Sequence, residues 1–163
     1  MRPEYGERKE KLMKKECVNR IDFTLPALSV NEGLARSLVG SAVSLLDPTL
    51  EELADIKCSV SEAVTNAIVH GYEGRGGAVY ISVKLYADRS VQIELRDKGC
   101  GIADVEEARR PLFTTDETGE RSGMGFTVME TFMDTLHVSS TPGRGTKVVM
   151  TKRLSYHGDG RKI

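Results

Sequence analysis

The sequence contains no tryptophan, and only 6% of its residues are aromatic. Its three cysteines, Cys17, Cys58 and Cys100, are odd in number and widely spaced, which fits neither a zinc site nor a disulfide framework, so a reducing cytoplasm is the expected location. No apolar run approaches the length of a membrane-spanning helix, and no apolar stretch follows the charged N-terminus as it would in a signal peptide. A formal net charge of -1 gives no electrostatic footprint for nucleic acid. We therefore expect neither membrane association nor direct DNA binding.

A chain of 163 residues with 39% hydrophobic and 29% charged residues has the size and composition of one globular domain. Residues 1–17 are mostly polar and offer no regular apolar face, so we expect a charged, flexible extension there. The folded domain is expected over residues 18–154, followed by a flexible tail over 155–163.

Hydrophobic periodicity predicts several helices and strands. In chain order, the expected elements are an edge strand over 18–25 that Pro26 ends, a helix over 29–46, a longer helix from Thr49 to His70 that Gly71 closes, a hairpin of strands over 79–85 and 91–95, a helix over 124–133, and a last pair of strands over 136–140 and 146–152. This order predicts an α+β fold: a single-domain, two-layer sandwich with a mixed, mostly antiparallel sheet and helices on one face.

Local signals mark the starts of the two long helices. Ser29, with Glu32 three residues later, matches a capping box, and Thr49 is the expected cap of the second helix. By contrast, the stretch from Gly99 to Gly123 has few residues of the buried type. A structureless stretch of that length inside a compact domain is usually functional, and we expect a lid.

The second long helix carries a polar stripe of Glu62, Asn66 and His70, each four residues apart and therefore on one face. Taken alone, such a stripe is more often explained by simple amphipathicity. As a site, however, it has suitable chemistry: an Asn amide oxygen is a good ligand for Mg²⁺ held between phosphates, and a Glu one turn away can accept the proton of an attacking hydroxyl. His70 is expected to close the helix end, where positive charge is favourable.

Two glycine-containing segments add to this pattern. Asp97 ends an apolar strand just before Gly99 and Gly101, where a fixed carboxylate can accept a hydrogen bond from the exocyclic amine of adenine; a tight turn is the alternative. Gly123 and Gly125 begin a helix, where exposed N–H groups bind anions. Arg121, just upstream, could stabilise a transferring phosphoryl group, although a lone Arg in a loop is more often merely solvated.

Longer segments carry a specific resemblance: LLDPT (45–49), SEAVTNAIVHGY (61–72), EEARRPLFTT (106–115) and ERSGMGFTVME (120–130). Together they resemble the sporulation anti-sigma F factors, a family of protein serine kinases within the GHKL ATPase/kinase superfamily. The likeness extends from about residue 21 to about residue 154. It implies a Bergerat fold with an ATP lid, binding of ATP or ADP with Mg²⁺, and a homodimer that binds sigma factor F and holds it inactive. It also implies transfer of phosphate to a serine of an anti-anti-sigma protein, which otherwise displaces sigma.

The resemblance assigns roles residue by residue. It implies that Glu62 is the catalytic base, that Asn66 is the Mg²⁺ ligand, that Arg121 meets the phosphates or the substrate protein, and that Arg36 is a contact shared by both protein partners. The remaining residues that it places at the nucleotide are Asp97, Gly99, Gly101, Thr114, Thr115, Ser122, Gly123, Met124, Gly125, Phe126 and Thr146. Phe126 also suits simple packing. Cys100, between two of these glycines, is expected to be structural or incidental, with a place near the nucleotide as the alternative.

Two other functions remain open on the sequence. A nucleotide-gated sigma inhibitor with negligible phosphate transfer would have the same ATP site, so only turnover separates it from the kinase. The ATP-binding half of a two-component histidine kinase would need a phosphoacceptor His on a helical hairpin. None of His70, His137 and His157 follows such a pattern, so a separate chain would have to supply the acceptor.

Overall fold

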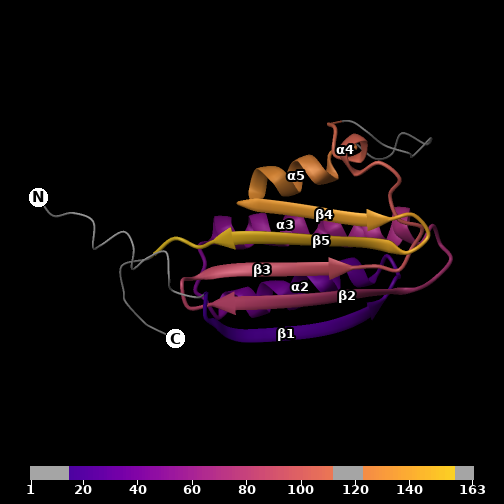
Figure 1. The fold of residues 1–163 in the computed structure, drawn as a ribbon. Coiled ribbons are helices and arrows are strands. Elements are labelled where there is room, and N and C mark those ends of the chain that lie inside the picture. Colours follow the sequence, from indigo (N-terminus) through magenta and orange to yellow (C-terminus); the bar gives the residue numbers. More distant parts are fainter. Residues whose placement is uncertain (1–14, 112–122, 157–163) are drawn as a thin grey trace, which may run out of the picture.

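The computed structural model describes residues 15–111 and 123–156. In these ranges, five strands form one sheet in the order β1-β2-β3-β5-β4 (Figure 1). Every pairing is antiparallel, so the predicted α+β fold is confirmed but the sheet is not mixed. The strands are β1 (Cys17–Pro26), β2 (Ala78–Tyr86), β3 (Ser90–Arg96), β4 (Thr135–Thr141) and β5 (Gly145–Arg153).

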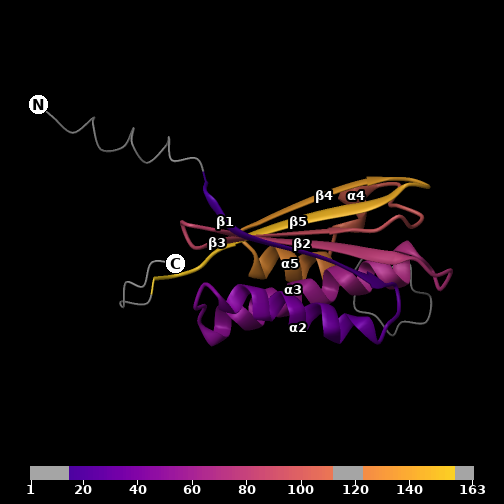
Figure 2. The ribbon, with the colours of Figure 1, turned by 90° about the horizontal axis from the view of Figure 1, so that it is seen from below.

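The long helices form the second layer. Figure 2 shows α2 (Asn31–Ser44), α3 (Leu50–Thr65) and α5 (Gly125–Phe132) on the same side of the sheet. A π-helical segment, η1 (Asn66–Gly71), continues α3, and a short helix, α4 (Val105–Ala108), contacts β4. In the part of the chain that the structure describes, no helix is long and apolar enough to cross a bilayer.

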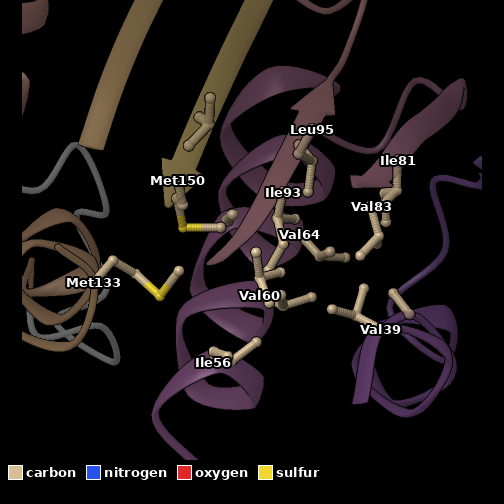
Figure 3. Close-up of a cluster of buried hydrophobic side chains, with 14 of the residues drawn as sticks. Val39, Ile56, Val60, Val64, Ile81, Val83, Ile93, Leu95, Met133 and Met150 are labelled. Carbon is tan, nitrogen blue, oxygen red and sulfur yellow. The ribbon is translucent and has the colours of Figure 1, made fainter. Parts of the chain in front are cut away.

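The core lies between the sheet and α2 and α3. Alternate residues of β2 and β3 point toward the helices, as their alternating patterns predicted, because successive side chains of a strand face opposite sides of a sheet. Figure 3 shows these strand residues packed against apolar residues of α2 and α3. The labelled core residues are Val39, Ile56, Val60, Val64, Ile81, Val83, Ile93, Leu95, Met133 and Met150.

The two predicted helix starts have different outcomes. Thr49 caps α3 in a complete capping box: its hydroxyl accepts the N–H of Glu52 at 2.9 Å, and the Glu52 carboxylate accepts the N–H of Thr49 at 2.9 Å. The prediction for Ser29 is wrong, because α2 begins at Asn31 and no side chain caps it. Glu32 instead accepts a hydrogen bond from the hydroxyl of Ser61 on α3. A partly buried contact with the neighbouring helix has taken the place of the local cap.

The apolar pattern of α2 combines a buried face with an exposed one. Val39, Ala42 and Leu46 are buried, whereas Leu34, Leu38 and Leu45 are 46%, 40% and 56% exposed. Helical spacing therefore predicted the helix but not which leucines the core takes up. The exposed leucines follow one another at spacings of four and seven residues, which are close to one and two helical turns, so they lie on one outward stripe.

The predicted structureless stretch is partly structured. Asp104 caps α4 by accepting the N–H of Glu107 at 2.9 Å, so residues 105–108 form a helical turn that the sequence did not indicate. Arg109, at the end of α4, donates to the Glu130 carboxylate of α5. Thr114, Thr115, Arg121 and Ser122 lie outside the described residues, as do residues 1–14 and 157–163.

Candidate functional site

One cavity of about 640 Å³ opens between the end of α3, η1, the loop after β3, α4 and the start of α5. This volume is in the range of pockets that hold small-molecule ligands. It brings together most of the predicted site residues that the structure describes: Glu62, Asn66, Asp97, Gly101, Gly123, Met124, Gly125, Phe126 and Thr146. Cys100 also lines the cavity, which was the alternative interpretation of this residue.

The helix that carries Glu62 and Asn66 changes its winding inside the site. The sequence predicted one helix as far as His70, but the α-helix ends at Thr65 and the next turn is π-helical. The N–H of Tyr72 bonds the carbonyl of Ala67, five residues back, at 3.0 Å. This wider turn keeps Asn66 and His70 on the cavity wall. Short π-helical turns of this kind recur at functional sites.

Gly125 lies directly against the two polar residues of the α3 helix. A Cβ at this position would be 3.0 Å from Glu62 Oε2 and 3.3 Å from Asn66 Nδ2. Glu62 and Asn66 are both half-buried and both line the cavity. The absence of a side chain at Gly125 therefore leaves open space at the point where a carboxylate, an amide and a helix start meet.

On the sequence prediction that this cavity holds a nucleotide, we expect Gly125→Ala to lower turnover of that nucleotide about 100-fold, because a misplacement of about 1 Å in a reacting group has an effect of this size. The fold should survive, since the Cβ meets only the ends of two flexible side chains. Gly33→Ala on α2 is the matched control, because its Cβ would meet nothing nearer than Arg36 Nη2 at 3.8 Å. Turnover and the melting temperature (Tm) of both variants test this. Full activity of Gly125→Ala would show that the contact has no role.

Asp97 is 7% exposed at the end of β3. Its Oδ1 accepts the N–H of Gly99 at 2.8 Å and that of Thr146 at 3.3 Å. Burial raises the pKa of this carboxyl above its ordinary value, and the two backbone N–H groups offset only part of that effect. Among the described residues both of these bonds go to Oδ1, so the second oxygen is left as an acceptor on the wall of the cavity.

Gly99 serves the packing of this wall. A Cβ at Gly99 would be 2.1 Å from the carbonyl oxygen of Gly71, so the loop after β3 lies backbone to backbone against the end of η1. The N–H of Cys100 donates to that same carbonyl at 2.8 Å. Tyr72 ties the loop further, since its hydroxyl accepts the N–H of Lys98 at 2.8 Å. Gly99 is therefore placed behind the cavity and is absent from its lining.

Thr146 is buried beside Asp97, and its hydroxyl contacts that of Ser140 at 2.9 Å. The Ser140 hydroxyl oxygen also accepts the N–H of Ile102 at 2.8 Å, which fixes the loop that follows Gly101. Sequence reasoning missed Ile102, Asp104 and Glu107 as lining residues. The signal available for the last two was the Asp-x-x-Glu spacing of a short capped helix.

Arg36 lies away from the cavity lining, on α2, with its side chain 47% exposed. Its guanidinium is 3.7 Å from Oε1 of Glu32, one turn earlier on the same helix. The structure thus separates the predicted partner contact from the predicted nucleotide site and puts them on neighbouring helices.

Comparison with known proteins agrees with this arrangement. Residues 25–152 match the model of the histidine kinase-like ATPase domain. The chain is 55% identical over 138 residues to an anti-sigma F factor of Bacillus licheniformis, a match that covers 84% of this chain and 94% of the relative. The chain belongs to the anti-sigma F factor family. Family members from Bacillus subtilis (strain 168), at 55% identity over 138 residues, and Clostridium acetobutylicum, at 52% over 137 residues, cover 94% and 95% of their own lengths.

Among solved structures, the RsbU and RsbW domains of Rv1364c from Mycobacterium tuberculosis superpose with a TM-score of 0.60 at 20% identity, over 84% of this chain and 32% of that one. This likeness concerns the fold, which is the GHKL sandwich that the sequence resemblance implied. A histidine kinase-like ATPase domain implies that this anti-sigma F family member binds a nucleotide. The cavity that Asp97 and Asn66 line has the size of pockets that hold small-molecule ligands.

The residues around Asn66 fit the Mg²⁺ ion that accompanies nucleotides in such domains. Its amide oxygen would be 3.4 Å from a Cβ at Gly125, so the missing Cβ leaves a cradle beside an oxygen ligand. In residues 15–111 and 123–156, no group of three or more His, Cys, Asp or Glu side chains could hold a metal alone.

Proposed function

We propose that this chain is an ATP-dependent protein serine kinase that inhibits the sporulation sigma factor F and phosphorylates the anti-anti-sigma protein that opposes it. The observation that carries the proposal is the convergence of Glu62, Asn66 and Gly125 in the cavity that also contains Asp97. Phosphoryl transfer needs positioning and charge stabilisation more than covalent chemistry, and this cavity supplies positioned polar groups.

Asp97 supports adenine as the base. Its carboxylate is fixed by the N–H groups of Gly99 and Thr146, so its remaining acceptor is held in one direction. That acceptor would take a hydrogen bond from the exocyclic amine of adenine. Guanine has a carbonyl oxygen at the corresponding atom, and a carboxylate would repel it. The buried position makes the mismatch costly, because a buried polar group without a partner is strongly unfavourable.

Glu62 supports transfer to a hydroxyl. Its carboxylate, next to Gly125 at the start of α5, would accept the proton of the attacking serine hydroxyl as the oxygen bonds to the γ-phosphorus and the bond to the β-phosphate oxygen breaks. Asn66 would hold Mg²⁺, which neutralises charge on the phosphates when bound. N–H groups at the start of α5, after Gly123, would contact phosphate oxygens. Arg121 would add positive charge there.

The surface of α2 supports the protein partners. Arg36 is exposed on it and would contact sigma factor F and the anti-anti-sigma protein in turn, which fits partner switching in the cytoplasm of a sporulating cell. The exposed stripe of Leu34, Leu38 and Leu45 is an apolar surface on the same helix. We propose that it contributes to a homodimer contact, because exposed apolar groups in one stripe mark interaction sites. No direct contact with DNA is needed for this function.

The proposal is tested by mixing the purified protein with radiolabelled Mg-ATP and the anti-anti-sigma protein of the same genome. We expect acid-stable label on a serine of the partner. Tight ATP binding with no label would instead favour a nucleotide-gated sigma inhibitor without turnover. A lack of any ATP binding would contradict the assignment of the cavity itself.

A further inference from the structure

One carboxylate joins the two helices that carry the partner contact and the proposed base. The Ser61 hydroxyl on α3 donates to Oε1 of Glu32 on α2 in a partly buried hydrogen bond. The same oxygen is 3.7 Å from Nη1 of Arg36. Glu32 is 26% exposed and Arg36 is 47% exposed, so the carboxylate lies at the border between the helix interface and the surface. A single oxygen thus serves one group from each helix.

Ser61 immediately precedes Glu62 in the same helical turn. Residues of one turn rotate together about the helix axis, so an anchor on Ser61 also sets the direction of the Glu62 side chain. That direction matters, because Glu62 Oε2 is only 3.0 Å from the Cβ position of Gly125. A small rotation of this turn would move the carboxylate away from the start of α5.

The charges of both helices reach the same stretch of surface. Burial raises the pKa of the Cys58 thiol, and the Glu62 and Asp55 carboxylates raise it further, while the Arg36 guanidinium lowers it. Cys58 is one turn before Glu62, on the exposed side of α3. Arg36 on α2 therefore lies close enough to α3 to act electrostatically on the turn before Glu62. This agrees with the contacts by which Glu32 connects Arg36 to Ser61.

We propose that Glu32 is a shared positioning residue that holds Arg36 for the protein partner and, through Ser61, holds Glu62 for phosphate transfer. The inference rests on the proposed kinase function. It means that docking of a partner at Arg36 and alignment of the base depend on one carboxylate. A partner that draws Arg36 away leaves the Glu32 carboxylate, which anchors Ser61, without its neighbouring positive charge. Partner binding is thereby linked to turnover.

Two substitutions separate the two halves of this role. Ser61→Ala removes the anchor of the catalytic turn and leaves the Glu32–Arg36 pair, so we expect about a tenfold fall in kcat with KM for the partner and for ATP unchanged within about twofold. Glu32→Gln keeps an oxygen that accepts from Ser61 but removes the charge that holds Arg36. We expect it to raise KM for the partner about tenfold with little change in kcat.

The measurement is steady-state phosphorylation of the anti-anti-sigma protein by the full-length chain. Ser61→Thr retains the hydroxyl and should recover most of the wild-type kcat. Ser59→Ala is the matched control on α3, because the Ser59 hydroxyl donates within its own helix, to the carbonyl of Asp55 at 2.9 Å. It should leave the kcat and KM values unchanged. Thermal unfolding of each variant shows whether the fold is intact.

The possible results distinguish a failure of the proposed kinase function from a failure of the proposed role of Glu32. Absence of transfer by the wild-type protein would contradict the proposed function, and this inference with it. Normal wild-type transfer with an unchanged kcat in Ser61→Ala would overturn the inference alone. So would equal losses in Ser61→Ala and Ser61→Thr, since any change at this position would then be harmful without regard to the hydroxyl.

Discussion

Glu62→Gln is expected to bind Mg-ATP within about twofold of the wild-type affinity and to transfer phosphate about 1,000-fold more slowly. The amide keeps the shape of the side chain beside Gly125 but accepts a proton far less readily, and general bases typically contribute about 10²- to 10⁴-fold to a rate. Nucleotide affinity from calorimetry and single-turnover transfer of radiolabelled phosphate measure the two effects separately.

Glu107→Gln is the control for this loss of charge. Glu107 lines the same cavity but lies on α4, its side chain is exposed, and it is not among the nearest contacts of a Cβ at Gly125. We expect its transfer rate to stay within about threefold of the wild-type rate. If Glu107→Gln and Glu62→Gln lost activity equally, the effect would come from the total charge of the cavity. A Glu62→Gln variant with the wild-type rate would show that another group accepts the proton.

Asp97→Asn is expected to weaken ATP binding about 100-fold, because the amide would present a donor or an off-axis acceptor to the exocyclic amine of adenine inside a buried site. The side-chain Oδ1 of Asn can still accept the N–H groups of Gly99 and Thr146, so the loop should keep its conformation. Asp104→Asn is the control, since Asp104 lines the cavity but is exposed, and Asn is also a good helix cap. Fluorescent or calorimetric titration with ATP measures both affinities. Wild-type affinity in Asp97→Asn would exclude this adenine contact.

The same substitution should raise the stability of the nucleotide-free protein. The pKa of Asp97 is raised in the fold by burial, so the charged carboxylate destabilises the folded state when the pH is above that pKa. This penalty declines as the pH falls below the raised pKa and disappears below the ordinary value of 3.8, where both the folded and the unfolded state hold the proton. We therefore expect a higher Tm for Asp97→Asn at pH 7 and a smaller Tm difference in acid. A lower Tm at pH 7 would contradict this sign.

Sequence periodicity was sufficient where burial alone decides the structure. The strands predicted over 79–85 and 91–95 lie within β2 and β3, and the residues expected to share a face are buried together. The cap of α3 at Thr49 could be predicted equally well, because its partner Glu52 is only three residues away. The joining of Glu62, Asn66 and Asp97 in one cavity also follows the predicted motifs.

Features that depend on distant contacts could not be predicted this way. The π-helical turn ends at Gly71, where the loop of Gly99 packs against it, and that contact spans 28 residues of sequence, so no local pattern indicates the extra residue in the turn. Ser29 failed as a cap because Glu32 reaches Ser61 on another helix. Helix α4, with only 4 residues, is too short to show a period.

The backbone contact between Gly99 and Gly71 constrains how this site can change over evolutionary time. No side chain separates the two segments, so no single substitution can widen or narrow that side of the cavity by exchanging a large residue for a small one. The carbonyl of Asp97 is held in the same way, 2.1 Å from the Cβ position of Gly145. Descendants of this sequence can therefore reshape the end of the cavity at Asp97 only by altering Asp97 itself or the residues that face it. The α4 side, with exposed Asp104 and Glu107, remains the part of the wall that is open to gradual variation.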